Sequence, residues 1–200
     1  MKALKLYINE ALHVNKNTKI QRYNYHPKTN GELEKLVKKL IKERGENSDL
    51  NDIDTSAITD MSYVFYNSKF NGDISEWDVS NVKDMHNMFI GAKFTGDISR
   101  WDVNNVTNMR NMFYQSQFNG DLSNWDVSKV ENMSAMFESS KFNGDISNWN
   151  VSNVTNMSYM FEDSKFNGDI SNWDVSNVDS MYCVFDMSPL EKNPPKWYKE

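Results

Sequence analysis

Large apolar side chains recur every 24 residues along most of the chain. Phenylalanine, glycine and methionine hold fixed places in each unit, and so do the tryptophans, which are Trp77, Trp101, Trp125, Trp149 and Trp173. A constant period in the twenties is typical of a solenoid, in which each unit packs only on its neighbours. The pattern therefore predicts a repeat protein with a thin, continuous core.

Within one unit the apolar spacing changes from that of a strand to that of a helix. Apolar and polar residues alternate over residues 94–98, which predicts a short strand. Apolar residues then recur three and four apart over residues 106–113, which predicts about two turns of helix, with Asn104 as its N-terminal cap. Parallel strands joined in this way have right-handed crossovers. We therefore expect a right-handed α/β solenoid.

Ten of the twelve methionines fall in two columns of the repeat, and these columns are 61/85/109/133/157/181 and 88/112/136/160. A methionine-rich surface can bind partners or soft metals. Because the first column shares its predicted helix side with a column of phenylalanines, we expect both methionine columns to lie in the core.

The repeats define the domain organisation. Residues 49–60 form a half-repeat, residues 61–180 form five full repeats, and residues 181–198 form a C-terminal cap, so the solenoid spans residues 49–198. Residues 1–48 do not repeat and are predicted to be an N-terminal α/β capping segment. Atypical ends keep a solenoid from stacking with other copies, so a monomer is favoured.

The capping segment has three predicted elements. Residues 3–13 have a helical apolar stripe and residues 20–25 alternate like a strand. Thr29 and Glu32 form a capping box for a second helix, and Gly45 stands where a left-handed C-terminal cap belongs. One side of this helix is apolar and consists of Leu33, Leu36, Val37, Leu40 and Ile41.

Charge is divided between the two parts of the chain. The net charge is −6, but residues 1–48 hold eleven basic and five acidic residues (+6), and residues 49–200 hold eleven basic and twenty-three acidic residues (−12). The basic side of the second helix consists of Lys35, Lys38, Lys39, Lys42 and Arg44. No aromatic residue lies among these cations to stack on bases. We therefore interpret this side as a solvated surface and do not expect a nucleic-acid partner.

No run of about 18 apolar residues, as a membrane span requires, occurs in the chain. The N-terminus has a basic start but polar residues interrupt any apolar segment, so neither a signal peptide nor a lipobox is predicted and a cytoplasmic protein is expected. Cys183 is the single cysteine, which excludes an internal disulfide and a CxxC metal site.

We find no pattern that predicts an enzyme, a cofactor or a metal site. His13, His26 and His86 stand at unrelated places, and no nucleophile and base share a useful spacing. Two aspartate columns recur, Asp73/97/121/145/169 and Asp78/102/126/174, with Asn150 completing the second. A calcium ladder is one interpretation. Because Asn150 keeps the acceptor oxygen without the charge, we favour side chains that accept backbone hydrogen bonds.

Function is expected where the repeats differ. The residue after the phenylalanine of the predicted helix is apolar in three units and acidic in the next three; these residues are Tyr66, Ile90, Tyr114, Glu138, Glu162 and Asp186. A helical residue that follows a buried one is normally exposed, and a row of exposed apolar residues indicates a contact site. A second column lies beside it, formed by Tyr63, Asn87, Asn111, Ala135 and Tyr159. The alternative is that both columns vary without function.

Residues 157–178, with the sequence MSYMFEDSKFNGDISNWDVSNV, closely resemble the BspA-like, Mycoplasma-lipoprotein type (DUF285) of bacterial surface repeat. The resemblance covers about residues 49–198. It implies a variant of the leucine-rich repeat and a non-catalytic adhesion or protein-binding module, often on the surface of host-associated bacteria.

Three functions follow from these observations. The first is a protein-binding module that uses the two variable columns. The second is an acidic inhibitor that occupies a nucleic-acid-binding surface of a bacterial enzyme, because a regular row of carboxylates can imitate an anionic polymer. The third is a passive surface or structural spacer with no dedicated partner.

Overall fold

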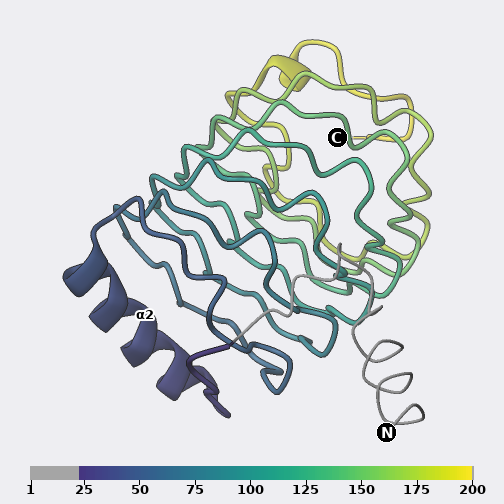
Figure 1. The fold of residues 1–200 in the computed structure, drawn as a ribbon. Helices are drawn as coiled ribbons and strands as arrows, with labels where there is room; N and C mark the ends of the chain where they lie inside the picture. Colours follow the sequence, from purple (N-terminus) through teal and green to yellow (C-terminus); the bar gives the residue numbers. More distant parts are fainter. Residues whose placement is uncertain (1–22, 200) are drawn as a thin grey trace, which may run out of the picture.

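The computed structural model describes residues 23–199, in which the chain winds through successive coils stacked on one another (Figure 1). Two helices are found in this part of the chain, the α-helix α2 (Asn30–Arg44) and the short 3-10 helix η1 (Pro189–Glu191). The predicted helix at residues 3–13 and most of the predicted strand at residues 20–25 lie outside the described residues. Neither helix in residues 23–199 is long and apolar enough to cross a membrane.

Neighbouring coils pair in parallel through residues 24 positions apart. Single bridges connect one coil to the next along a column formed by Asp60, Asp84, Asn108, Asn132, Asn156 and Ser180. Further bridges join Asp49 to Asp73, and Tyr25 to Ile53. Within the described residues, the same parallel register therefore repeats from each coil to the next. Its classification as a right-handed leucine-rich-repeat-like solenoid stays a prediction.

The segment predicted to be helical in each unit is instead a run of tight turns, so that prediction is wrong. Every second amide between residues 64 and 68 donates to the carbonyl three residues before it. Tyr63 (φ 62°) and Asn67 (φ 51°) adopt left-handed backbone conformations, which an α-helix excludes and the third residue of a type II turn requires. Asn87 and Gly91, at the equivalent positions of the next unit, accept this conformation at low cost.

The remaining amides of the same segment bond to the next coil. The donors Met61, Tyr63, Phe65 and Asn67 reach the carbonyls of Asp84, His86, Met88 and Ile90, in that order, over 2.7 to 3.3 Å. Alternate amides therefore close local turns and join neighbouring coils. Both sets of bonds satisfy the backbone, and turns with three-residue hydrogen bonds bury residues three and four apart. This explains why the apolar spacing resembled that of a helix.

The predicted strand at residues 94–98 is also absent, since pairing within residues 23–199 is limited to the single bridges given above. The amide of Lys93 bonds to the carbonyl of Ser68 at 3.0 Å, but the amide of Thr95 bonds to the side-chain oxygen of Asn71 at 2.7 Å. Side-chain acceptors thus replace part of the expected backbone ladder on this side of the coil.

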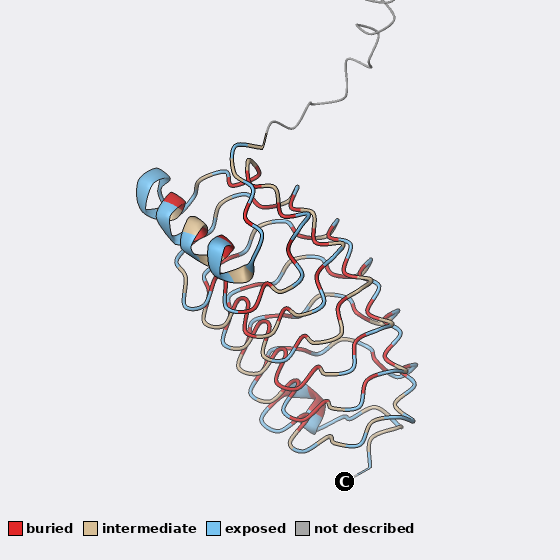
Figure 2. Cartoon of the chain, turned by 90° about the horizontal axis from the view of Figure 1, so that it is seen from below, coloured by how far each residue is buried: buried red, intermediate tan, exposed pale blue. Residues whose placement is uncertain are grey.

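The core runs through the middle of the stack, as Figure 2 shows by the buried residues on the inner side of each coil. The predicted methionine ladders are confirmed as core: from Met61 to Met160 both columns are fully buried. Phenylalanine rings stack between coils, with Phe65 and Phe89 at 5.3 Å and nearly parallel. The five tryptophans from Trp77 to Trp173 are buried too, and each indole nitrogen bonds to a carbonyl of the preceding coil, as Trp125 Nε1 does to Ile98 at 3.1 Å.

Helix α2 begins where its cap was predicted. Thr29 Oγ1 accepts from the amide of Glu32 at 3.3 Å, but Glu32 Oε2 accepts from the amide of Lys28 at 2.7 Å, one residue before the expected partner. Gly45 has a positive φ of 98°, but its ψ of 166° is not that of a left-handed helical cap. The apolar side of α2 lies in the common core through Leu33, Val37 and Leu40.

Asn30, in the first turn of α2, covers the exposed edge of the first coil. Its side-chain Nδ2 donates to the carbonyls of Asp60 and Ser62, at 3.1 and 2.9 Å. In later coils the equivalent carbonyls, those of Asp84 and His86, accept from the coil before. One side chain therefore replaces the missing preceding coil, which is how α2 protects an edge that would otherwise pair with another chain.

Candidate functional site

The six residues of the first variable column lie in one line along the turns. These residues are Tyr66, Ile90, Tyr114, Glu138, Glu162 and Asp186. Backbone hydrogen bonds of 2.7 to 2.9 Å align them: the amide that follows Tyr66 donates to the carbonyl of Ile90, and the same bond recurs from each coil to the next. Neighbouring members are therefore separated by about one strand spacing, roughly 4.8 Å. The structure brings all six together, although a ladder of turns and not a helix aligns them.

The first coils expose the apolar half of this line. Tyr66 is 50% exposed and Tyr63, from the flanking column, is 43% exposed. Their rings contact each other with centroids 5.8 Å apart, and Tyr63 also packs edge-on against His86 at 5.1 Å. Ile90 and Tyr114 are partly exposed in the next two coils. The result is a contiguous patch of aromatic and aliphatic surface.

The later coils form an acidic half. Burial, together with the neighbouring carboxylates of Glu162 and Asp163, raises the pKa of Glu138 to about 7. Burial also raises the pKa of the Tyr114 hydroxyl, and the charges of Glu138 and Glu162 add to that effect. Within residues 23–199, no lysine or arginine forms an ion pair with these carboxylates; the ion pairs of lysine and arginine there involve residues of α2.

The flanking column is exposed only in part. Every member has a left-handed backbone, from Tyr63 to Tyr159. Tyr159 is 36% exposed, whereas Asn87 and Ala135 are buried. Asn111 Nδ2 donates to Asn87 Oδ1 at 2.8 Å, so these two side chains bind one another. Only the two tyrosines of this column can therefore contact a partner through a large side chain.

Sequence reasoning missed an exposed aromatic residue at the C-terminal end of the same side. Tyr182 is 66% exposed, and its ring packs edge-on against Tyr159 with centroids 5.3 Å apart. It stands where earlier units have Ser158, Ser134 and Arg110, and so it belongs to neither of the two columns considered. The sequence feature that could have identified Tyr182 is a tyrosine at a position where the three preceding units have small or polar residues.

The aspartate columns accept backbone hydrogen bonds, as expected. In the first column each Oδ1 accepts from the amide two residues later, at 2.8 to 2.9 Å, as Asp121 does from Ser123. These bonds lower the pKa of Asp121. In the second column Asn150 keeps the same bond to the amide of Ser152, at 3.1 Å. Within the described residues, no three histidine, cysteine, aspartate or glutamate side chains are grouped to hold a metal ion.

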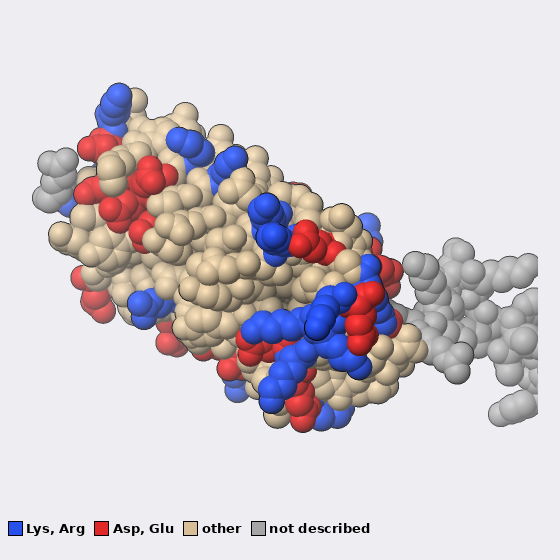
Figure 3. Space-filling model, turned by 90° about the vertical axis from the view of Figure 1, so that its left-hand side faces the viewer, with Lys and Arg blue, Asp and Glu red and all other residues tan. Residues whose placement is uncertain are grey.

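Basic side chains gather on the side of the molecule where α2 lies, with acidic side chains among them (Figure 3). Lys38 pairs with Glu34 and Lys39 with Glu43, each one helical turn apart. Arg44 makes two bonds of 2.9 Å to Asp52. Several of the cations of this surface are thus already paired within the chain.

A family model described as "Mycoplasma protein of unknown function, DUF285" matches residues 33–141 and, in a second match, residues 115–198. Together the two matches extend from residue 33, within α2, to residue 198. The comparison with curated proteins found no match, and the comparison with solved structures found none either.

Proposed function

The chain belongs to the DUF285 family of Mycoplasma proteins, and we propose that it is a non-catalytic protein-binding module. The proposed binding region, called the turn surface below, combines the line of six residues with the two exposed tyrosines of the flanking column; it consists of Tyr66, Ile90, Tyr114, Glu138, Glu162, Asp186, Tyr63 and Tyr159. A protein partner would lie along the stacking direction and contact several turns at once.

The observation that most supports this proposal is the apolar patch on three adjacent coils. Tyr66 and Tyr63 are about half exposed, and Ile90 and Tyr114 continue the patch. Scattered exposed apolar residues are ordinary, but a contiguous patch rimmed by polar residues marks interaction sites. Tyrosine suits such a site because it offers a large contact area with little loss of side-chain entropy.

The acidic half of the turn surface would set the orientation of a bound partner. Glu138, Glu162 and Asp186 continue the same line beyond Tyr114, without lysine or arginine partners of their own in the described chain. A partner with basic residues at one end would be oriented by these charges, and a partner with acidic residues there would be repelled. The proposal therefore assigns affinity to the apolar half and register to the acidic half.

The proposal is tested with the triple variant Tyr66→Ser, Ile90→Ser and Tyr114→Ser. Partners are captured from a lysate of the source cells with the wild-type chain, purified, and measured against each variant. We expect the triple variant to bind at least about tenfold more weakly, which corresponds to about 1.4 kcal/mol. The control triple variant changes Arg100, Asn124 and Asn148 to Ser, all exposed and none part of the turn surface. Equal affinities of the two triple variants would refute the proposal.

The second candidate function is the acidic inhibitor, which the first aspartate column favours. Its five members are exposed and aligned, and the carboxylates of Asp97 and Asp145 act on Asp121 between them. Such a row could occupy a basic surface of an enzyme that binds nucleic acid. Under this alternative the affinity collapses as salt rises from about 0.05 to 0.5 M, whereas binding through the apolar patch weakens only modestly.

A further inference from the structure

A small hollow opens in the side of the stack where Ala135 lies between two larger residues of its column. Asn111 precedes it and Tyr159 follows it, and backbone bonds of 2.9 and 2.8 Å join these three coils in order. Ala135 offers only a methyl group, so the space that a longer side chain would fill is empty. The hollow has a volume of about 410 Å³, within the range of small-molecule sites.

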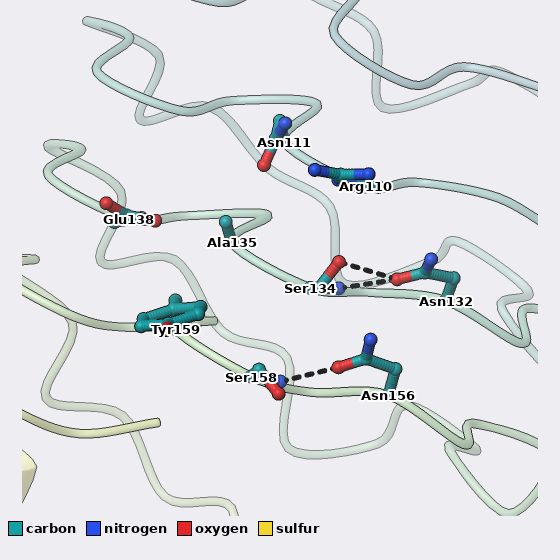
Figure 4. A pocket seen from close by; sticks show the side chains of 9 residues that line it. All are labelled: Arg110, Asn111, Asn132, Ser134, Ala135, Glu138, Asn156, Ser158 and Tyr159. Atoms are coloured by element: carbon teal, nitrogen blue, oxygen red, sulfur yellow. Dashed lines mark hydrogen bonds between the residues drawn. The ribbon is translucent and has the colours of Figure 1, made fainter. Parts of the chain in front are cut away.

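Hydrogen-bond donors line one side of the hollow. Figure 4 shows Arg110, Asn132 and Asn156 along it, with the two asparagine oxygens directed at the serine of the same coil. Asn132 Oδ1 accepts from Ser134 at 2.9 Å and Asn156 Oδ1 from Ser158 at 2.9 Å. Neither asparagine Nδ2, and no guanidinium nitrogen of Arg110, donates a hydrogen bond to another group within residues 23–199. These donors are therefore available to a ligand.

An acceptor and an aromatic ring line the other side. Glu138 lies at the rim, and the ring of Tyr159 forms part of the wall (Figure 4). With a pKa of about 7, the carboxyl of Glu138 is present in both its protonated and its charged form at neutral pH. It can therefore donate or accept a hydrogen bond there.

We propose that this hollow is a binding site for a neutral saccharide unit, held between the donors Arg110, Asn132 and Asn156 and the acceptor Glu138, with one side of the sugar ring on Tyr159. This site goes beyond the proposed protein-binding function and does not depend on it. Planar guanidinium, amide and carboxyl groups match pairs of adjacent hydroxyls, and the C–H groups of a pyranose pack on an aromatic ring.

The charges around the hollow favour a neutral ligand over an ion. An anion would meet Glu138, and behind it Glu162 and Asp163, whose carboxylates act on Glu138. A cation would meet the guanidinium of Arg110 on the opposite wall. A hydroxyl-rich molecule uses both signs at once, because each hydroxyl both donates and accepts.

The test uses saturation-transfer NMR on the intact chain with four separate probes: methyl β-glucopyranoside, methyl β-galactopyranoside, methyl α-mannopyranoside and N-acetylglucosamine. We expect at least one of them to bind with a Kd on the order of 1 mM, as a shallow and polar site allows. The charged probes sialic acid and arginine amide, measured in the same way, should bind more weakly.

Two variants and a control locate the binding. Ala135→Asn places a carboxamide group in the hollow at its centre and should preserve the fold, because asparagine accepts the left-handed backbone of Ala135 (φ 54°) better than alanine does. Ala135→Asn and Tyr159→Ala should each weaken binding at least tenfold. Tyr63→Ala removes an equally placed tyrosine three coils away from Ala135 and should leave binding unchanged.

The outcomes separate this inference from the proposed function. Absence of transfer to all four sugars, or transfer that persists in Ala135→Asn, would overturn the saccharide site. Tighter binding of arginine amide than of any sugar would show that the hollow takes a cationic side chain and would overturn the ligand class. None of these results affects the apolar patch, which is tested by the variants at Tyr66, Ile90 and Tyr114.

Discussion

Replacement of Trp125 by alanine should destabilise the protein strongly. The indole is 3% exposed, lies 6.4 Å from the ring of Phe113, and donates from Nε1 to the carbonyl of Ile98 at 3.1 Å. Loss of a buried tryptophan from a core costs about 3–5 kcal/mol. The bond to Ile98 is lost as well, but the carbonyl of Ile98 still accepts from the amide of Trp101 at 3.1 Å, so this loss adds only about 0.5–1.5 kcal/mol. We therefore expect a loss of at least about 3 kcal/mol, a large part of the stability of an ordinary domain.

Trp125→Phe separates the two contributions. It keeps a buried ring but removes both the donor and part of the indole, so it should cost less than Trp125→Ala, about 1–3 kcal/mol. Both variants are unfolded in urea, and the transition is followed by circular dichroism. The slope of each transition is compared with that of the wild type, because a changed slope would mean that the coils no longer unfold together. A loss below about 1 kcal/mol for Trp125→Ala would refute the role given to the tryptophan column.

Three further predictions concern the rest of the molecule. The raised pKa of Glu138 lowers the free energy of unfolding as pH rises from 4.5 through about 7. Glu138→Gln should therefore be as stable as the wild type at pH 4 but about 1 kcal/mol more stable than it at pH 8, since solvent screening reduces the full effect. A variant that gains no stability at pH 8 contradicts this prediction. Asn30→Ala should lower the free energy of unfolding in urea by about 1–3 kcal/mol, because the carbonyls of Asp60 and Ser62 lose the donor that covers them. The uncovered edge should also promote association, which gel filtration detects. A variant that stays monomeric with unchanged stability argues against the capping role. EDTA should leave the thermal midpoint unchanged, because the aspartate columns serve backbone amides; a fall of several degrees would indicate a bound ion.

Burial could be predicted well from the sequence, because apolar residues that recur in every unit have no reason to persist at the surface. The methionine columns up to Met160, the five tryptophans from Trp77 to Trp173, and Leu33, Val37 and Leu40 of α2 lie in the core. Met181, Leu36 and Ile41 are only partly buried against it. The hydrogen-bonding role of the aspartates was also predictable, since Asn150 keeps the oxygen and loses the charge.

The backbone path within a unit could not be predicted from apolar spacing alone. Consecutive turns and an α-helix both bury residues three and four apart, so residues 106–113 fit either. The distinguishing signal was present in Asn87, Asn111 and Gly91, which favour a left-handed backbone at fixed places of the repeat. The hollow at Ala135 depends on side-chain directions in three coils at once, and the sequence shows only that a small residue stands between two larger ones.

The most direct test of the proposed binding surface is site-specific photo-cross-linking to the purified partner. Benzoylphenylalanine is placed singly at Tyr66, Ile90 or Tyr114, and for comparison at Asp97 or Asp121 in the exposed aspartate column. We predict cross-links from the three turn positions and none from the two aspartate positions. Cross-links confined to the aspartate positions would contradict the account and identify the acidic column as the surface that the partner contacts.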